Sequence, residues 1–262
     1  RKIIQKVLVS MLKWLKRSEL RVVKRKGTSP FYKEVHIPTW IVSIFVFLIL
    51  FWTLLPEIGI DTRSVIGLML FVALIQFMVV FYLKTDMPHV LSSDGDIMLL
   101  GLVCVFYVLM MKTAIVLNLS YYLIPLQSAA ILMAILLNRR LALIINLILC
   151  LIIAILNRFN FNCLFYFILS GIAGILGAGG RVRNRWDLTR AGLFVLVADL
   201  VVLLILDLFG AEQSNEMHFL AIFGNGFLVI VLSHGLLPIL ESLFSKTTNI
   251  RLLELADLSH PL

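Results

Sequence analysis

The chain has 262 residues, of which 61% are hydrophobic and 15% are charged, and its mean hydropathy is +1.02. Soluble domains have about 45–50% apolar and about 25% charged residues, so this composition excludes an ordinary water-soluble protein. The net charge of +8 does not favour nucleic acid as a partner, because the basic residues gather in one terminal segment and in short loops between apolar blocks.

Residues 1–36 form a basic segment in which apolar residues recur at helical spacing against lysines and arginines. This pattern predicts an amphipathic helix on the cytoplasmic membrane surface, where each basic residue contributes about 1 kcal/mol of attraction to anionic lipid. The alternative is a solvated tail that only fixes the orientation of the protein.

Eight apolar blocks follow, and each is long enough, or nearly so, to cross a hydrocarbon core of about 30 Å as a helix. Backbone groups in hydrocarbon must bond internally, so the sequence predicts an all-α, polytopic transmembrane helix bundle. The predicted spans are residues 37–55, 65–83, 97–119, 121–137, 141–156, 163–176, 191–209 and 219–240. The first is a separate N-terminal helix, and the other seven form a domain at residues 65–240.

The distribution of basic residues predicts the orientation of the bundle. If the N-terminus is cytoplasmic, nearly all lysines and arginines fall on the cytoplasmic side, and both termini are then cytoplasmic. The acidic loop at residues 84–96 is placed inside only by the order of the spans. The arginines expected to anchor this orientation are Arg139, Arg140, Arg181, Arg183 and Arg185.

The sixth block carries small residues at intervals of three and four, including Gly171, Gly174 and Gly177. Small residues allow membrane helices to approach closely, so we interpret these glycines as helix-packing positions. Flexing of this helix during function is the alternative.

Ionisable residues within the spans are costly unless they are paired. Asp199 is expected near the middle of the membrane and Lys112 nearer the outer surface, and Lys112 is predicted to pair with Asp199 or with Asp207. The other polar residues of the spans are expected to form hydrogen bonds between helices, and they are Gln76, Gln127, Asn146, Asn225 and His234.

The chain contains no complete catalytic motif. Ser170-Gly171 has Ile168 where a rhomboid protease needs glycine, and Asp94-Gly95-Asp96 lacks the later aspartates of an alcohol phosphotransferase. The three cysteines have no metal-like spacing. We therefore assign no catalytic or metal-binding residue and expect no cofactor in this chain.

The segment at residues 241–262 follows the last span, and Thr248 or Asn249 in it can cap a short amphipathic helix. This segment, which ends in Ser-His-Pro-Leu, resembles the stretch that leaves the membrane in seven-transmembrane receptors with an intracellular HD hydrolase domain. That bacterial family includes cyclic-di-AMP phosphodiesterases, and the resemblance covers residues 65–262. We interpret the segment as an output linker, with Glu241, Arg251, Glu254 and His260 as its polar positions.

The resemblance implies a metal-binding HD domain after residue 262, with Mn or Fe, and an extracytoplasmic sensor domain in the place where this chain has only residues 56–64. This chain alone is then expected to be inactive, and the full-length parent is expected to be a metal-dependent phosphodiesterase of the bacterial cytoplasmic membrane. The expected partners are the lipid bilayer and the parent's own HD domain, with homo-oligomer formation left open.

Two functions are compatible with these features. The first is a transmembrane signalling module that couples an outside signal to cytoplasmic hydrolysis of cyclic-di-AMP. The second is a small-solute transporter or channel, which would require polar groups that converge near the middle of the membrane.

Overall fold

The computed structural model describes residues 39–58, 61–179, 185–213 and 215–244, and all of them belong to one compact unit. The amphipathic segment predicted at residues 1–36 lies outside the described residues. So do two of the predicted anchors and three of the predicted linker positions, which are Arg181, Arg183, Arg251, Glu254 and His260.

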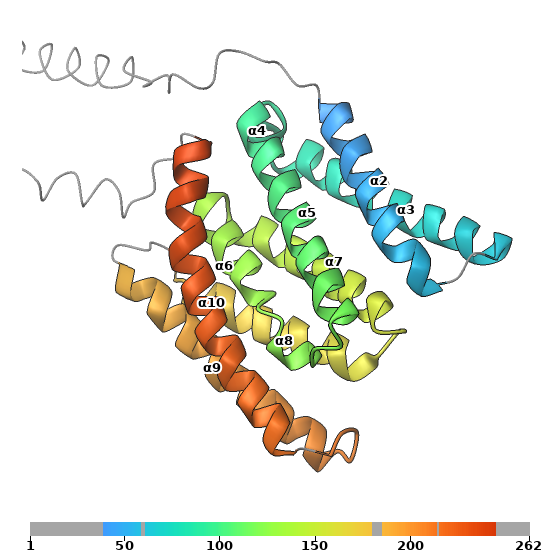
Figure 1. The fold of residues 1–262 in the computed structure, drawn as a ribbon. Helices are drawn as coiled ribbons and strands as arrows, with labels where there is room; N and C mark the ends of the chain where they lie inside the picture. The colour runs from blue at the N-terminus through green and yellow to red at the C-terminus, as the bar shows by residue number, and fades with distance from the viewer. Residues whose placement is uncertain (1–38, 59–60, 180–184, 214, 245–262) are drawn as a thin grey trace, which may run out of the picture. The chain divides into compact units, whose positions relative to one another are not determined.

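Helices account for all of the regular secondary structure in the described part of the chain, as the apolar blocks predicted (Figure 1). The elements are α2 (Thr39–Ile58), α3 (Thr62–Asp86), α4 (Pro88–Leu91), α5 (Asp94–Val116), the 3₁₀ turn η1 (Tyr121–Leu123), α6 (Gln127–Leu136), α7 (Arg139–Leu156), α8 (Phe161–Gly177), α9 (Arg185–Leu208) and α10 (Glu216–Leu243). Among the described residues, six helices are long and apolar enough to cross a membrane, namely α2, α3, α5, α7, α9 and α10. The predicted polytopic helical fold is thus confirmed, whereas the side on which each end lies stays a prediction.

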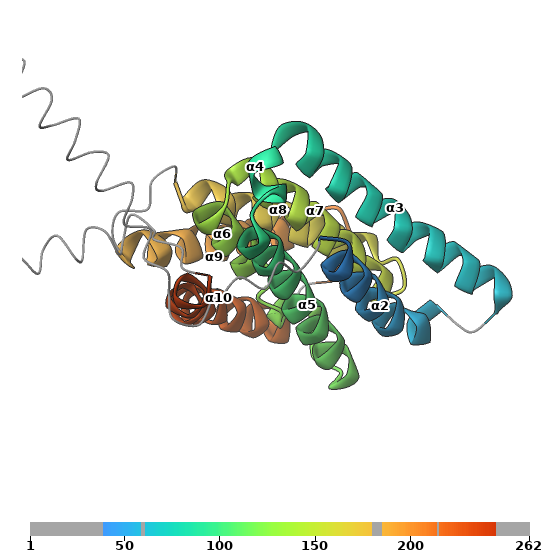
Figure 2. The same ribbon diagram turned by 90° about the horizontal axis from the view of Figure 1, so that it is seen from above.

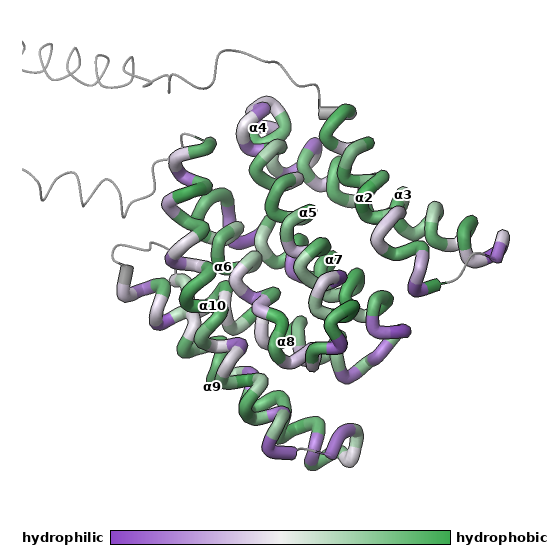
Figure 3. Tube along the Cα trace, in the orientation of Figure 1, coloured by the Kyte–Doolittle hydropathy of each residue, from purple (hydrophilic) through white to green (hydrophobic). Residues whose placement is uncertain are grey.

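The outer surfaces of the helices are apolar, as lipid contact requires. Large hydrophobic side chains are exposed on them, including Trp52 at 77% and Phe77 at 66%. Figure 3 shows the hydrophobic residues along the lengths of the helices, with hydrophilic residues gathered toward the connecting turns. A surface of this kind in water would be an extensive exposed patch, but in a bilayer it is solvated by hydrocarbon.

The fourth predicted span, at residues 121–137, is not one continuous helix. Pro125 has no N–H and restricts the residue before it, so Ile124 is extended, with ψ of 113°. As a result α6 begins only at Gln127 and has 10 residues, too few to cross a core of about 30 Å alone. Most of α6 is buried against α7, α8 and α10, which keeps its broken backbone away from lipid.

The most extensive helix packing joins α8 to α9, α9 to α10 and α7 to α8. In both views α2 and α3 lie on the opposite side of the bundle from α9 and α10 (Figure 1 and Figure 2). Glycines permit the close approaches: an added Cβ at Gly174 would lie 3.0 Å from Val195, and one at Gly171 would overlap the Asn146 side chain. An added Cβ at Gly177 would lie 3.0 Å from the backbone of Ala191.

Replacement of Gly177 by alanine tests whether this close approach supports the bundle. The new methyl group would push α8 away from the α9 backbone, so Gly177→Ala is expected to lower the free energy of unfolding by about 1–3 kcal/mol. Gly235→Ala in α10 is the matched control, because an added Cβ there meets nothing within 4 Å. Reversible unfolding of the purified chain in detergent measures both, and equal stability of the two variants would contradict the close packing.

Candidate functional site

Polar side chains from four helices meet in the interior of the bundle. Asp199 of α9, Asn225 of α10 and Gln127 of α6 are all 0% exposed. Tyr166 and Ser170 of α8 are buried beside them. We refer to these five residues as the core polar cluster.

Asn225 is the centre of the core polar cluster. Its Nδ2 donates to Asp199 Oδ2 at 2.9 Å, to Tyr166 OH at 3.1 Å and to Gln127 Oε1 at 3.4 Å. Gln127 Nε2 donates in turn to Ser170 Oγ at 2.5 Å. Since an amide nitrogen carries two hydrogens, three acceptors compete for them, and this one side chain of α10 connects α6, α8 and α9.

Two oxygen atoms of the cluster remain without a hydrogen-bond partner among the described residues. They are Asp199 Oδ1 and Asn225 Oδ1, and both are buried. A buried polar atom without a partner costs about 1–3 kcal/mol. A shift of the helices that brought a donor to either oxygen would therefore be favoured. Chemically the arrangement suits interhelical bonding, and among the described residues no group of three or more His, Cys, Asp or Glu side chains could hold a metal.

Aromatic side chains extend the cluster toward the loop between α9 and α10. The rings of Tyr166 and Tyr122 meet edge to face with centroids 4.9 Å apart, and Tyr122 lies 4.2 Å from Tyr121 and 5.0 Å from His218 by the same measure. Tyr121 OH donates to Glu212 Oε2 at 2.6 Å. Contacts thus continue without a break from Glu212 in this loop to the core polar cluster.

The partner of Lys112 differs from the prediction. Its Nζ lies 2.5 Å from Glu57 Oε1, which replaces the predicted pairing with Asp199 or Asp207. The apolar block predicts that the first span ends at residue 55, which places Glu57 in a loop. In the structure α2 continues through Pro56 to Ile58, which carries Glu57 alongside the end of α5.

Two further acidic residues named in the sequence predictions, Asp207 and Glu241, are described by the structure. Asp207 is exposed near the end of α9. Glu241 had been assigned to the output linker, but α10 continues to Leu243, so Glu241 lies in a helix and is only 6% exposed. The last span is therefore longer than predicted, and Glu241 near its end is packed against the bundle.

Of the basic anchors that the structure describes, Arg139 and Arg140 lie at the start of α7 and Arg185 is the first residue of α9. Arg139 Nε donates to the carbonyl of Gly179 at 3.1 Å, just after the end of α8. A cation at the C-terminal end of a helix is favourable because that end carries partial negative charge. The Arg140 backbone N–H donates to Asn138 Oδ1, which caps α7.

The polar residues of the spans fall into three groups. Gln127 and Asn225 bond to other helices, and so does Gln76, which accepts from Ser43. His234 bonds to the carbonyl of Ile230 in its own helix. Asn146 packs against Gly171. Tyr166 and Ser170 were not proposed as bonding partners from the sequence, although both lie well inside an apolar helix, where a polar side chain needs a partner.

The fold and the buried polar cluster define a multi-pass α-helical membrane protein. Residues 62–248 match the family described as 7TM receptor with intracellular HD hydrolase, and the chain belongs to this family. The match begins at the first residue of α3, and the described residues within it contain seven helices of ten or more residues together with α4. Residues 62–248 are thus the membrane region of such a receptor, and among the described residues α2 lies before it.

One relative is the cyclic-di-AMP phosphodiesterase PgpH of Bacillus subtilis (strain 168). It is 28% identical over 215 residues, which cover 76% of this chain and 30% of the relative. The chain therefore spans less than a third of the length of this curated relative. No solved structure matches the chain.

A double-mutant cycle tests the bond between α9 and α10 at the cluster. Asn225→Leu leaves three acceptors without their donor and is expected to lower the free energy of unfolding by about 1–3 kcal/mol. Combined with Asp199→Leu, the cycle should give a coupling energy of about 0.6–1.7 kcal/mol, the range found for hydrogen bonds between membrane helices. Additive effects of the two substitutions in reversible unfolding would show that the residues do not interact.

Proposed function

We propose that the chain is the membrane signalling module of an HD-type cyclic-di-AMP phosphodiesterase in the bacterial cytoplasmic membrane. In this role it couples an extracytoplasmic signal to hydrolysis of the nucleotide in the cytoplasm. Membership of the receptor family supports the coupling of membrane and hydrolase, and the similarity to PgpH supports cyclic-di-AMP as the substrate.

The single observation that carries the proposal is the position of Asn225 on α10. This helix bonds to the other three helices of the cluster through Asn225, and its last turns lead to the C-terminal segment. A single displacement of α10 would change the hydrogen-bond partners of Asn225 and would also move the start of the C-terminal segment. Signalling requires two arrangements of similar free energy, and a donor shared among three acceptors supplies a local means to form them.

The chemical step belongs, in this proposal, to the HD domain of the full-length protein. That domain would hold the divalent metals, Mn or Fe, and would be the partner of the helix bundle within the same polypeptide. The lipid bilayer is the second partner, and association of two copies of the chain is a further part of the proposal.

Solute transport is the second candidate, because the core polar cluster supplies the convergent polar groups that transport requires. Against it, Asp199, Asn225 and Gln127 are all 0% exposed, so the cluster is closed to solute in this conformation. Solute uptake into liposomes that is abolished by Asp199→Asn would favour a transporter and overturn the signalling proposal.

The signalling proposal is tested with the full-length protein in nanodiscs with Mn²⁺. It should hydrolyse cyclic-di-AMP, and Asn225→Leu should change the rate by about fivefold or more, the lower range of allosteric coupling. Phe223→Leu is the matched control, since Phe223 is an exposed hydrophobic side chain on the same helix. A full-length protein that lacks hydrolysis would refute the assignment, and a rate unaffected by Asn225→Leu would refute coupling through the cluster.

The predicted orientation is tested by labelling of single introduced cysteines in intact cells. Arg140→Cys should react only after the inner face is made accessible, and Gln213→Cys should react with an impermeant maleimide from outside, because both positions are exposed. The unsubstituted chain is the control, since its three cysteines, Cys104, Cys150 and Cys163, are buried. The reverse pattern of labelling would invert the bundle and remove the cytoplasmic output.

A further inference from the structure

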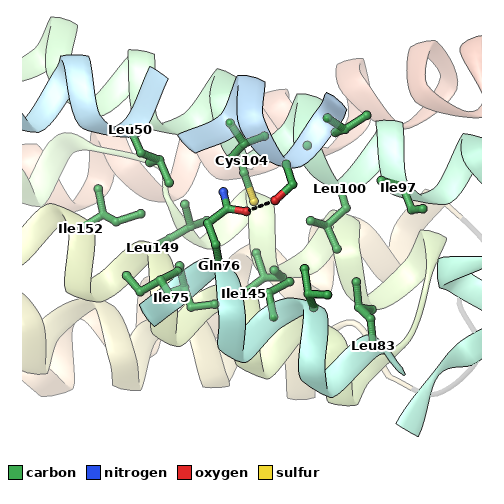
Figure 4. Close-up of a pocket in the computed structure, with 17 residues that line it drawn as sticks. Leu50, Ile75, Gln76, Leu83, Ile97, Leu100, Cys104, Ile145, Leu149 and Ile152 are labelled. Carbon is green, nitrogen blue, oxygen red and sulfur yellow. Dashed lines mark hydrogen bonds between the residues drawn. The ribbon is translucent and has the colours of Figure 1, made fainter. Parts of the chain in front are cut away.

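A cavity of about 70 Å³ lies between α2, α3, α5 and α7, apart from the core polar cluster (Figure 4). Apolar side chains form nearly all of its lining, among them Ile75 and Val79 of α3 and Leu149 of α7. Ser43 and Gln76 are the two lining residues whose side chains carry hydrogen-bonding nitrogen or oxygen atoms.

The cavity exists because α3 is only partly packed. Among the described residues, α3 packs extensively along α2 and against α4, but not against α5 or α7. At the edge of the cavity Val80 is 36% exposed, and its neighbours on α3, Phe77 and Phe81, are exposed hydrophobic side chains. Because Val80 both lines the cavity and is exposed, the cavity borders the outer surface of the bundle at α3.

The size and lining of the cavity favour an apolar occupant. One buried water needs about 10–15 Å³ and two to four polar partners, so this larger cavity offers room for more than water but few bonds to hold it. An empty apolar cavity deprives the atoms that line it of dispersion contacts. A hydrocarbon from the adjacent bilayer restores these contacts without breaking hydrogen bonds.

The amide of Gln76 adds a polar requirement. Ser43 Oγ donates to Gln76 Oε1 at 2.5 Å, and among the described residues this is the one hydrogen bond of the Gln76 side chain. Figure 4 shows the amide projecting among the lining residues Cys104, Leu149 and Leu100, with its nitrogen on the side away from that bond. An amide N–H that faces hydrocarbon without an acceptor costs free energy, so the cavity lacks one acceptor oxygen.

The depth of Gln76 excludes the ester groups of ordinary phospholipids as that acceptor. Gln76 lies about ten residues, or roughly 15 Å, from the Asp86 end of α3, which places it well inside a core of about 30 Å. The missing acceptor must therefore belong to a molecule that is dissolved in the bilayer interior.

We propose that this cavity binds an apolar molecule from the bilayer interior that carries a carbonyl or hydroxyl oxygen. Its hydrocarbon part packs against Ile75, Val79 and Leu149, and its oxygen accepts a hydrogen bond from Gln76 Nε2. The inference does not depend on the proposed phosphodiesterase role, because it concerns a different set of helices.

Photolabelling of the chain in nanodiscs tests the site. Two probes are used, a medium-chain ketone and a hydrocarbon of the same length, each with a diazirine. The ketone should crosslink to the lining of α3, α5 and α7, and Gln76→Leu should lower its labelling by about fivefold, the effect of one hydrogen bond. Labelling by the hydrocarbon probe should be unchanged in Gln76→Leu, which shows that this variant keeps its fold.

A second variant fills the cavity. Val79→Phe should reduce labelling by both probes, whereas Met78→Phe, on the exposed face of the same helix, should leave both unchanged. Crosslinks that fall only on outward-facing residues, or equal ketone labelling of the native chain and Gln76→Leu, would overturn the proposal. If Val79→Phe does not fold, the comparison of the two probes on Gln76→Leu still decides the question.

Discussion

The bundle depends on one constraint: polar groups inside hydrocarbon must find their partners within the protein. The core polar cluster meets it in part, because four helices are bonded at a single amide, that of Asn225, while Asp199 Oδ1 and Asn225 Oδ1 stay without a partner among the described residues. The same constraint explains why the interrupted helix α6 is enclosed by α7, α8 and α10 and not placed at the lipid surface. Apolar packing alone gives little preference for particular neighbours when lipid is as apolar as the helices, so the hydrogen bonds and the close glycine contacts select the arrangement.

Tyr166 connects the core polar cluster to the aromatic side chains near the α9–α10 loop. Its hydroxyl accepts from Asn225, and its ring packs on Tyr122, which lies against His218 near the start of α10. Two residues in the first half of α10, His218 and Asn225, are thereby connected to the same set of contacts. A signal that displaced the α9–α10 loop would act on α10 at one end, and the opposite end leads to the C-terminal segment. Contiguous contacts of this kind supply a physical route for coupling, although the free-energy difference between two states decides its strength.

The sequence predicted the existence and approximate limits of the helices, because apolar blocks of membrane length have few other structures open to them. It failed where neighbours in space decide the outcome. The predicted partner of Lys112 is wrong because the first span is predicted to end three residues before the end of α2 at Ile58. That boundary leaves Glu57, the observed partner, outside the helix. The convergence of polar side chains on Asn225 is also not predicted, since hydropathy shows that a residue is in a span but not which side chains face it. The break before α6, by contrast, can be predicted from the sequence, because Pro125 restricts Ile124 through local steric clashes.

The shortness of α6 bears on how the chain enters the membrane during synthesis. A helix of 10 residues offers the insertion machinery far less apolar length than a usual span of about 20 residues. Its burial depends on α7, α8 and α10, all of which leave the ribosome later. We therefore expect α6 to reach its final depth only after those helices have been made. Assembly of the bundle would then be completed only when its C-terminal half has been synthesised.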